Sequence, residues 1–233
     1  RLREVRLLSP LDKHAPETLD AHPLVREWFG HSLRRANEAA WRAAHGRLYD
    51  HLRDTTKEGA APTLEQLAPL YQAIAHGCRA GRRQEALDDV YANRICQRRP
   101  DGDIVFYASS MLGALGSDLA AITWFFDVPY ATPSPSLSEA ARAWVLSVAA
   151  SCLRAQGRLA EALPAIRTGL GMEEARDDWR NAAISASNLS EAALLVGDVG
   201  SAIATAERAV AHADRSDAAF VMLANRTTQA EAL

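Results

Sequence analysis

Histidines and acidic residues are the side chains of this chain best suited to chemistry, and their spacing favours neither catalysis nor metal binding. His14, His22 and His31 are spaced neither as a helical i, i+4 pair nor as zinc ligands. His45 and His51 are predicted on different faces of one helix. The paired acids lie at predicted helix ends or exposed faces, where we expect them to be caps or solvating charges. These pairs are Asp88–Asp89, Glu173–Glu174 and Asp177–Asp178.

The chain also lacks the signals of nucleotide hydrolysis and of covalent catalysis. No G-x-x-x-x-G-K-[ST] loop occurs, since neither Lys13 nor Lys57 follows a suitable glycine, and G-H-S at 30–32 does not fit G-x-S-x-G. The three cysteines include no C-x-x-C pair, which argues against a disulfide framework or a zinc site. We therefore expect no catalytic residues, and no metal or cofactor bound by this chain itself.

Composition places the chain among ordinary globular proteins. Hydrophobic residues make up 48% and charged residues 24% of its 233 residues, and the net charge is −3. This balance argues against a nucleic-acid binder or an anionic-membrane binder. The sequence has no apolar run near 18 residues, so no membrane span is predicted, and unpaired cysteines favour a cytoplasmic location. Because the sequence begins without methionine, we interpret it as part of a longer protein.

A short motif recurs along the chain. A glycine, a polar stretch and then Ala plus Leu or Ile occur at Gly81, Gly116, Gly157 and Gly197, with intervals of 35, 41 and 40 residues. Helix-like stretches flank each glycine, and a glycine placed there ends a helix in a left-handed conformation. The repeated unit is therefore predicted to be helix, glycine turn, helix.

This unit resembles the tetratricopeptide repeat, in which small residues lie where the two helices of a hairpin meet. The resemblance implies an all-α fold: a right-handed α-solenoid over residues 63–233, with about four hairpins and a truncated fifth. The matching positions are Ile74, Ala86 and Asn93 around Gly81; Ser109, Ala121 and Val128 around Gly116; Ala150, Ala162 and Gly169 around Gly157; and Ser190, Ala202 and Ala209 around Gly197. The last two sets fit best.

Helix boundaries follow from local signals. T-L-E-Q at 63–66 and S-L-S-E at 136–139 have capping-box spacing. Between the second and third repeats, the proline-rich V-P-Y-A-T-P-S-P-S at 128–136 either divides the superhelix or forms a longer surface loop. A last helix is predicted over 218–232, and its apolar stripe, including Phe220 and Leu223, favours self-association.

The first 36 residues break the repeat pattern. Two short strands are predicted over 3–11 and 18–21, followed by an amphipathic helix over 23–36 with Leu24, Trp28 and Leu33 on one face. Pro23 suits the first turn of that helix, which places His22 at its N-cap. A hairpin followed by a helix is typical of the end of a winged-helix domain.

The stretch L-D-A-H-P-L-V-R-E-W-F at 19–29 resembles the winged-helix domain of STAND-type signalling ATPases of the NB-ARC and NACHT kind. That family carries Met-His-Asp followed by Leu-Val, and the matching residues are Ala21, His22 and Pro23, followed by Leu24 and Val25. The resemblance implies that His22 contacts the phosphate of ADP in the inactive state of the full-length protein, while Pro23 replaces the aspartate. The alternative is that His22 caps its helix or packs against Trp28.

The resemblance covers the whole chain and implies three parts: residues 1–36 end a winged-helix domain, 37–62 form a connecting helix and linker, and 63–233 form the repeats. It implies an upstream NTPase module that binds ADP or ATP with Mg²⁺, and a sensing and autoinhibitory role for the repeats of a bacterial signalling protein. The alternative is a generic tetratricopeptide scaffold, or the repeat region of a large transcriptional regulator without a nucleotide switch.

The concave face of such an array is expected to bind a protein or peptide rather than nucleic acid or membrane. Trp144 beside Arg154 is either a peptide anchor, as such residues often are, or part of the packing between hairpins. The repeats contain no lysine, which argues against a clamp for C-terminal carboxylates. The predicted groove residues are Asp103, Phe106, Ser110, Trp144, Ser147, Ser151, Arg154, Ser187 and Glu191.

Overall fold

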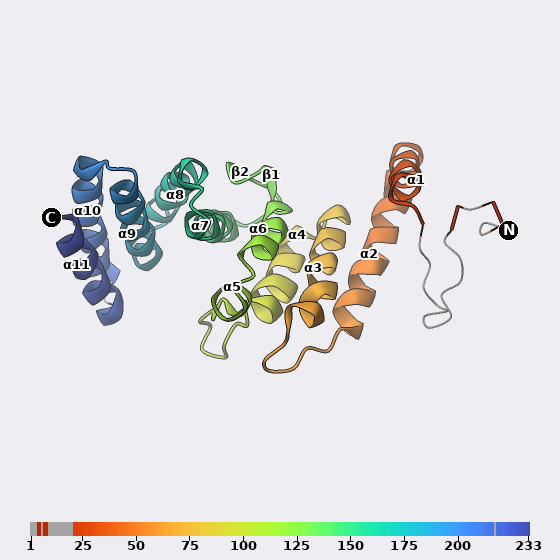
Figure 1. Cartoon of the computed structure of the whole chain (residues 1–233), viewed down its shortest axis with the longest axis horizontal. Coiled ribbons are helices and arrows are strands. Elements are labelled where there is room, and N and C mark those ends of the chain that lie inside the picture. The colour runs from red at the N-terminus through yellow and green to blue at the C-terminus, as the bar shows by residue number, and fades with distance from the viewer. Residues whose placement is uncertain (1–3, 6, 9–20, 217) are drawn as a thin grey trace.

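The computed structural model describes residues 4–5, 7–8, 21–216 and 218–233. Over these residues the chain is mostly helical, with one small two-stranded sheet. The helices follow one another along the long axis of the molecule, from α1 at one end to α11 at the other (Figure 1). The elements are α1 (Pro23–Ala36), α2 (Glu38–Thr55), α3 (Leu64–Arg79), α4 (Arg83–Glu85), the π-helix η1 (Ala86–Ile95), α5 (Tyr107–Leu112), α6 (Leu115–Thr123), β1 (Phe126–Val128), β2 (Thr132–Pro133), α7 (Glu139–Ala155), α8 (Leu159–Glu174), α9 (Trp179–Leu195), α10 (Val199–Ser216) and α11 (Ala219–Ala232).

The start of α1 agrees with its predicted bounds and cap. His22 is the N-cap residue, and its Nδ1 accepts a hydrogen bond of 3.3 Å from the Leu24 N–H, with Pro23 as the first helical residue. Asn37 then ends α1 and caps α2, since its side-chain oxygen accepts from the Ala40 N–H at 2.9 Å. The two predicted strands before α1 fall outside the described residues, except for residues 4–5, 7–8 and 21. Residues 4–5 form a turn, residues 7–8 form a bend, and Ala21 has no regular structure, so none of them is a strand.

Helices α2, α3 and η1 pack side by side. The predicted capping box at the start of α3 is confirmed: the Gln66 N–H donates to Thr63 Oγ1, and the Thr63 N–H donates to Gln66 Oε1. The helix after Gly81 begins as α4 but continues as a π-helix, which the sequence did not predict. Its hydrogen bonds span five residues, as from the Cys96 N–H to the Tyr91 carbonyl oxygen at 2.8 Å.

The prediction of a turn at Gly116 is wrong. Gly116 lies inside α6, and the left-handed residue is Gly113 (φ 64°), which ends the six-residue helix α5. Gly113 lies three residues before Gly116 and lacks the polar stretch of the motif, yet α5 ends at Gly113. Tyr71 on α3 donates a hydrogen bond of 2.7 Å to the buried carboxyl of Asp118 on α6, which ties this unit to the preceding one.

The proline-rich stretch forms a short antiparallel hairpin of β1 and β2, in which Phe126 lies opposite Pro133. The sequence did not predict these strands. α6 packs against α7, so helix packing continues past the hairpin. The capping box predicted at Ser136 is also wrong, because Ser136 bonds to Ser134, whereas Ser138 Oγ accepts from the Ala141 N–H at 3.2 Å and caps α7.

From α7 onward, each helix packs against the next, and α11 also contacts α9. The helices before Gly81, Gly157 and Gly197 end in one shared motif: the glycine has φ of 74° to 84°, and the following N–H bonds to the carbonyl five residues earlier. These are the turns predicted at those three glycines. Asp177 (φ 56°) ends α8 in the same way, with the Asp178 N–H bonded to the Glu173 carbonyl oxygen, which the sequence did not predict.

Small residues lie between paired helices where predicted in the last two repeats. Ser190 on α9 donates a hydrogen bond of 2.9 Å to the backbone oxygen of Ala202 on α10, which requires close helix axes. In the first two sets the poorer matches, Asn93 and Val128, are exposed. At the far end, Phe220 on α11 is 82% exposed, and Leu223 is also exposed, in agreement with the predicted apolar stripe.

Candidate functional site

The most continuous candidate surface runs along one face of α7. Trp144, Ser147, Ser151 and Arg154 follow a spacing of three and four residues, which places them on one side of the helix. Two pockets lie along this face. Ser147, Ser151 and Arg154 line the smaller one, and Trp144 and Ser147 line the larger one. The structure therefore brings the predicted α7 residues together on a hollowed surface.

The larger pocket, which we call the Trp144 pocket, has a volume of about 400 Å³. It lies between η1, the loop before α5, α7 and the junction of α8 with α9. Its lining is mixed, with aromatic, acidic and basic side chains. The lining residues are Gln84, Leu87, Asp88, Arg98, Ile104, Ser138, Ala140, Ala141, Ala143, Trp144, Ser147, Glu173, Arg176, Asp178 and Asn181.

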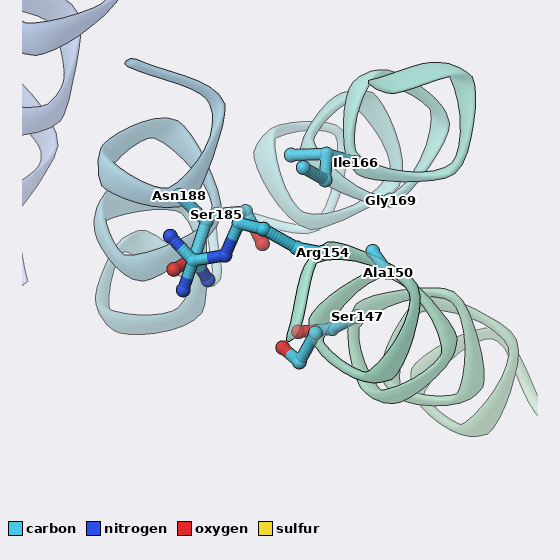
Figure 2. A pocket seen from close by; sticks show the side chains of 8 residues that line it. Ser147, Ala150, Arg154, Ile166, Gly169, Ser185 and Asn188 are labelled. Carbon is cyan, nitrogen blue, oxygen red and sulfur yellow. The ribbon is translucent and has the colours of Figure 1, made fainter. Parts of the chain in front are cut away.

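The smaller pocket, which we call the Arg154 pocket, lies between α7, α8 and α9 (Figure 2). Arg154 extends from α7 toward Ser185 and Asn188 on α9, and its guanidinium forms an ion pair with Glu191. Ser147 lines both pockets, so the two adjoin along α7, and we call them together the groove. The Arg154 pocket adds a volume of only about 10 Å³ to it. The remaining lining residues are Ala150, Ser151, Ile166 and Gly169.

Trp144 takes part both in packing and in the pocket wall. Its ring centroid lies 5.9 Å from that of Tyr91 on η1 and 6.4 Å from that of Phe106, and the side chain is half-buried. The sequence left open whether Trp144 anchors a ligand or packs between hairpins. The geometry fixes the ring against its neighbours and leaves part of it on the pocket surface.

Glu173, at the end of α8, is the residue that sequence reasoning missed. We predicted the Glu173–Glu174 pair to be solvating charges or caps, but Glu173 is only 3% exposed because α9 covers it. Ser185 on α9 hydrogen-bonds to its carboxylate, while Oε2 has no partner among the described residues. Burial, followed by the nearby charge of Asp178, raises the pKa of Glu173 from 4.5 to about 7.

The other paired acids have conventional roles. Glu174 pairs with Arg208 and His212 on α10. The Asp178 side chain accepts from the Asn181 N–H at 3.4 Å and caps α9, as predicted for such pairs. Asp88 accepts from the Gln84 side chain at 2.8 Å. No signal within the sequence separates Glu173 from these residues, because its burial depends on a helix that follows it.

The remaining predicted groove residues lie apart from the pocket linings. Asp103 is exposed, and its Oδ1 lies 3.6 Å from Nη2 of Arg180. Ser110 is exposed on α5. Ser187 on α9 donates a hydrogen bond of 2.9 Å to Thr228 on α11, so α11 already occupies its hydroxyl. These three side chains are not part of the groove defined above.

His22 is the N-cap residue of α1. Helix α1 lies at the opposite end of the molecule from α11, with α2 to α6 between it and α7 (Figure 1). Its Nδ1 is used as an acceptor in the cap, so the proton of the neutral ring is on Nε2, on an exposed side chain. That nitrogen is a hydrogen-bond donor beside a helix N-terminus, where anions are stabilised. His22 therefore caps α1 through Nδ1, and its Nε2–H remains as a donor for an anion.

Comparison of the chain with protein-family models, curated proteins and solved structures gave no match. Within the described ranges, no helix has both the length and the apolar character needed to cross a membrane. Among the same residues, no three His, Cys, Asp or Glu side chains gather in a way that could hold a metal ion.

Proposed function

We propose that this chain is a partner-binding region of tetratricopeptide-like hairpins, stacked as a right-handed solenoid, which holds a protein or peptide in the groove along α7. The observation that carries the proposal is that one face of α7, from Trp144 to Arg154, borders two adjoining pockets. The shared turn geometry at Gly81, Gly157 and Gly197 supports the repeat assignment.

Site-specific photo-crosslinking in living cells tests this function. A photo-reactive amino acid at Ser151, an exposed residue of the groove, is expected to crosslink to a discrete partner. The matched control is Thr168, which is exposed on α8 but does not line the groove. Equal crosslinking from both positions, or none from Ser151, would contradict binding in the groove.

We further propose that the chain is the sensing and autoinhibitory region of a STAND-type signalling ATPase. Its support is the resemblance around His22, together with the position of that residue at a helix N-cap. The apolar side chains Leu24 and Trp28 on α1 are exposed, Trp28 to 64%, which suits packing against an upstream NTPase module. A ligand that binds the open arrangement more tightly would shift the population toward activity.

Replacement of His22 in the intact protein tests the switch. His22→Ala is expected to weaken ADP retention and raise basal activity, whereas His31→Ala, also exposed on α1 but not a cap, should leave both near wild type. ADP release is measured with a fluorescent nucleotide. If His22→Ala changes neither property, or if no P-loop module precedes this region in the gene, the simple scaffold is the better interpretation.

A further inference from the structure

We propose that the Trp144 pocket receives a cationic side chain, the guanidinium of an arginine or the ammonium of a lysine, from the bound protein or peptide. The inference rests on the proposed partner-binding function and names the chemistry that the groove recognises. Glu173 is the residue that holds the cation, and Trp144 is the aromatic residue of the same pocket lining.

The unpartnered oxygen of Glu173 is the first reason. The side chain is 97% buried, lines the pocket, and receives one hydrogen bond from Ser185, while Oε2 has none from the described residues. A buried polar atom without a partner is costly, and a carboxylate costs most. A ligand that donates N–H groups to this oxygen would remove that cost, and a charged donor would do so most strongly.

The other charged residues of the lining already have partners or lie in solvent. Asp178 accepts a hydrogen bond from the Asn181 N–H. Its Oδ2 lies 3.5 Å from Nη2 of Arg176, and this ion pair compensates the charge of Arg176. Asp88 accepts from Gln84, and Arg98 is exposed. Among the described acids of the lining, Glu173 is the one with a buried carboxyl oxygen that lacks a partner. An anionic ligand would face that carboxylate and be disfavoured.

The aromatic wall is the second reason. Trp144 is held by ring contacts to Tyr91 and Phe106, so it keeps its place without a ligand. Tryptophan is the side chain that attracts cations most strongly through its ring face. A buried carboxylate and a fixed indole on one pocket suit a guanidinium or ammonium better than they suit a neutral or anionic group.

Titration with capped model peptides at pH 8, above the raised pKa of Glu173 of about 7, tests the inference on the charged carboxylate. The probe is acetyl-Gly-Gly-Arg-Gly-Gly-amide, matched by the same peptide with citrulline, which keeps the shape and loses the charge. Binding is followed through the ¹⁵N indole signal of Trp144, assigned with Trp144→Phe. The arginine peptide and its lysine analogue are expected to shift this signal, and citrulline to bind at least tenfold more weakly. Equal shifts by arginine and citrulline would overturn the inference.

Two variants and one small molecule complete the test. Glu173→Gln is expected to weaken binding of the arginine peptide at least tenfold. Glu139 is an exposed acid on α7 outside the pocket, so Glu139→Gln should leave this binding unchanged. Unchanged binding by Glu173→Gln would overturn the role of the carboxylate. Free arginine amide that binds more tightly than the peptide would overturn a protein as the source of the cation.

The failure of this inference is distinguishable from failure of the proposed function. If Ser151 crosslinks to a partner in cells and Glu173→Gln leaves that crosslink unchanged, the groove binds proteins but without a cation in this pocket. If the arginine peptide binds and Ser151 captures no partner, the pocket chemistry stands and the partner-binding function fails.

Discussion

Gly77 on α3 lies directly against the ring of Tyr49 on α2. A Cβ at residue 77 would stand 2.9 Å from Cδ2 of Tyr49 and 2.9 Å from Cβ of Ala86 on η1, closer than such atoms can lie. Tyr49 and Ala86 are both fully buried. Three helices therefore meet at a point where only glycine fits.

Gly77→Ala is expected to destabilise the chain by about 1–3 kcal/mol, because the added methyl overpacks this contact. Gly46→Ala on α2 is the matched control, since its Cβ would meet only Cβ of Ala80, at 3.9 Å. The control should be neutral or up to about 1 kcal/mol stabilising, because alanine favours helix. Urea unfolding measures both changes, and equal effects would contradict the close contact.

The difference in backbone conformation between Gly157 and Gly116 gives a second prediction. Gly157 has φ 74°, whereas Gly116 lies in α6 without a positive φ and with open space around it. Gly157→Ala is expected to destabilise by about 1–2 kcal/mol, because alanine is disfavoured in the left-handed region. Gly116→Ala should be neutral or slightly stabilising. Loss of stability in Gly116→Ala equal to that in Gly157→Ala would restore the original assignment.

The buried carboxyl of Glu173 makes stability depend on pH. Its pKa is raised from 4.5 to about 7, so between these values the folded chain keeps a proton that the unfolded chain loses. The free energy of unfolding therefore falls as pH rises through this window. Glu173→Gln removes the effect, and its stability relative to wild type should rise by on the order of 3 kcal/mol from pH 4.5 to pH 8.

Thermal and urea unfolding at several pH values check this expectation. Glu139→Gln is the matched control, because it makes the same substitution at an exposed position on α7. A difference between Glu173→Gln and wild type that is constant across the pH range would show that the carboxyl is not held neutral by the fold.

A pair of histidines gives the opposite pH dependence. Nδ1 of His45 on α2 lies 2.7 Å from Nδ1 of His76 on α3, a contact that needs one donor and one acceptor. Burial, and then the charges of His76 and Arg79, lowers the pKa of His45 from 6.5 to about 4. Since the folded chain resists protonation, stability is present above pH 6.5 and is lost as pH falls toward 4.

His45→Gln is therefore expected to lose less stability than wild type between pH 7 and pH 4.5, by on the order of 1 kcal/mol, because solvent screens the part-exposed ring. His51→Gln, an exposed position on the same helix, should follow the wild-type curve. Urea unfolding at the two pH values measures the difference. Parallel behaviour of His45→Gln and wild type would contradict the burial of a neutral ring.

Local signals predicted much of the fold, because helix ends are set by a few neighbouring residues. The helix over 23–36, the Thr63 capping box and the turns at Gly157 and Gly197 all follow from such signals. The same reasoning failed at Gly116, because the left-handed turn is at Gly113, which does not carry the repeated motif. It also missed Asp177, which adopts the left-handed conformation although it is not glycine.

The candidate site was predicted in part, because spacing within one helix can be read from the sequence whereas contacts between helices cannot. Helical spacing placed Trp144, Ser147 and Arg154 on one face, and the structure keeps them together. Glu173 could not be found this way, because its burial and its partner Ser185 belong to contacts between helices. Ser187 was misplaced for the same reason, since α11 binds its hydroxyl.

Packing between helices that are close in sequence has a mechanical consequence. Each helix in the described ranges packs mainly on helices that are near it along the chain, so few contacts connect α1 to the interior, and no residue of α1 is buried. Such a chain can fray at one end while its middle stays folded. The rate of amide hydrogen exchange should therefore fall along the chain from α1, where it is fastest, to the helices near α7, where it is slowest. The groove would then stay folded while the end helices open locally.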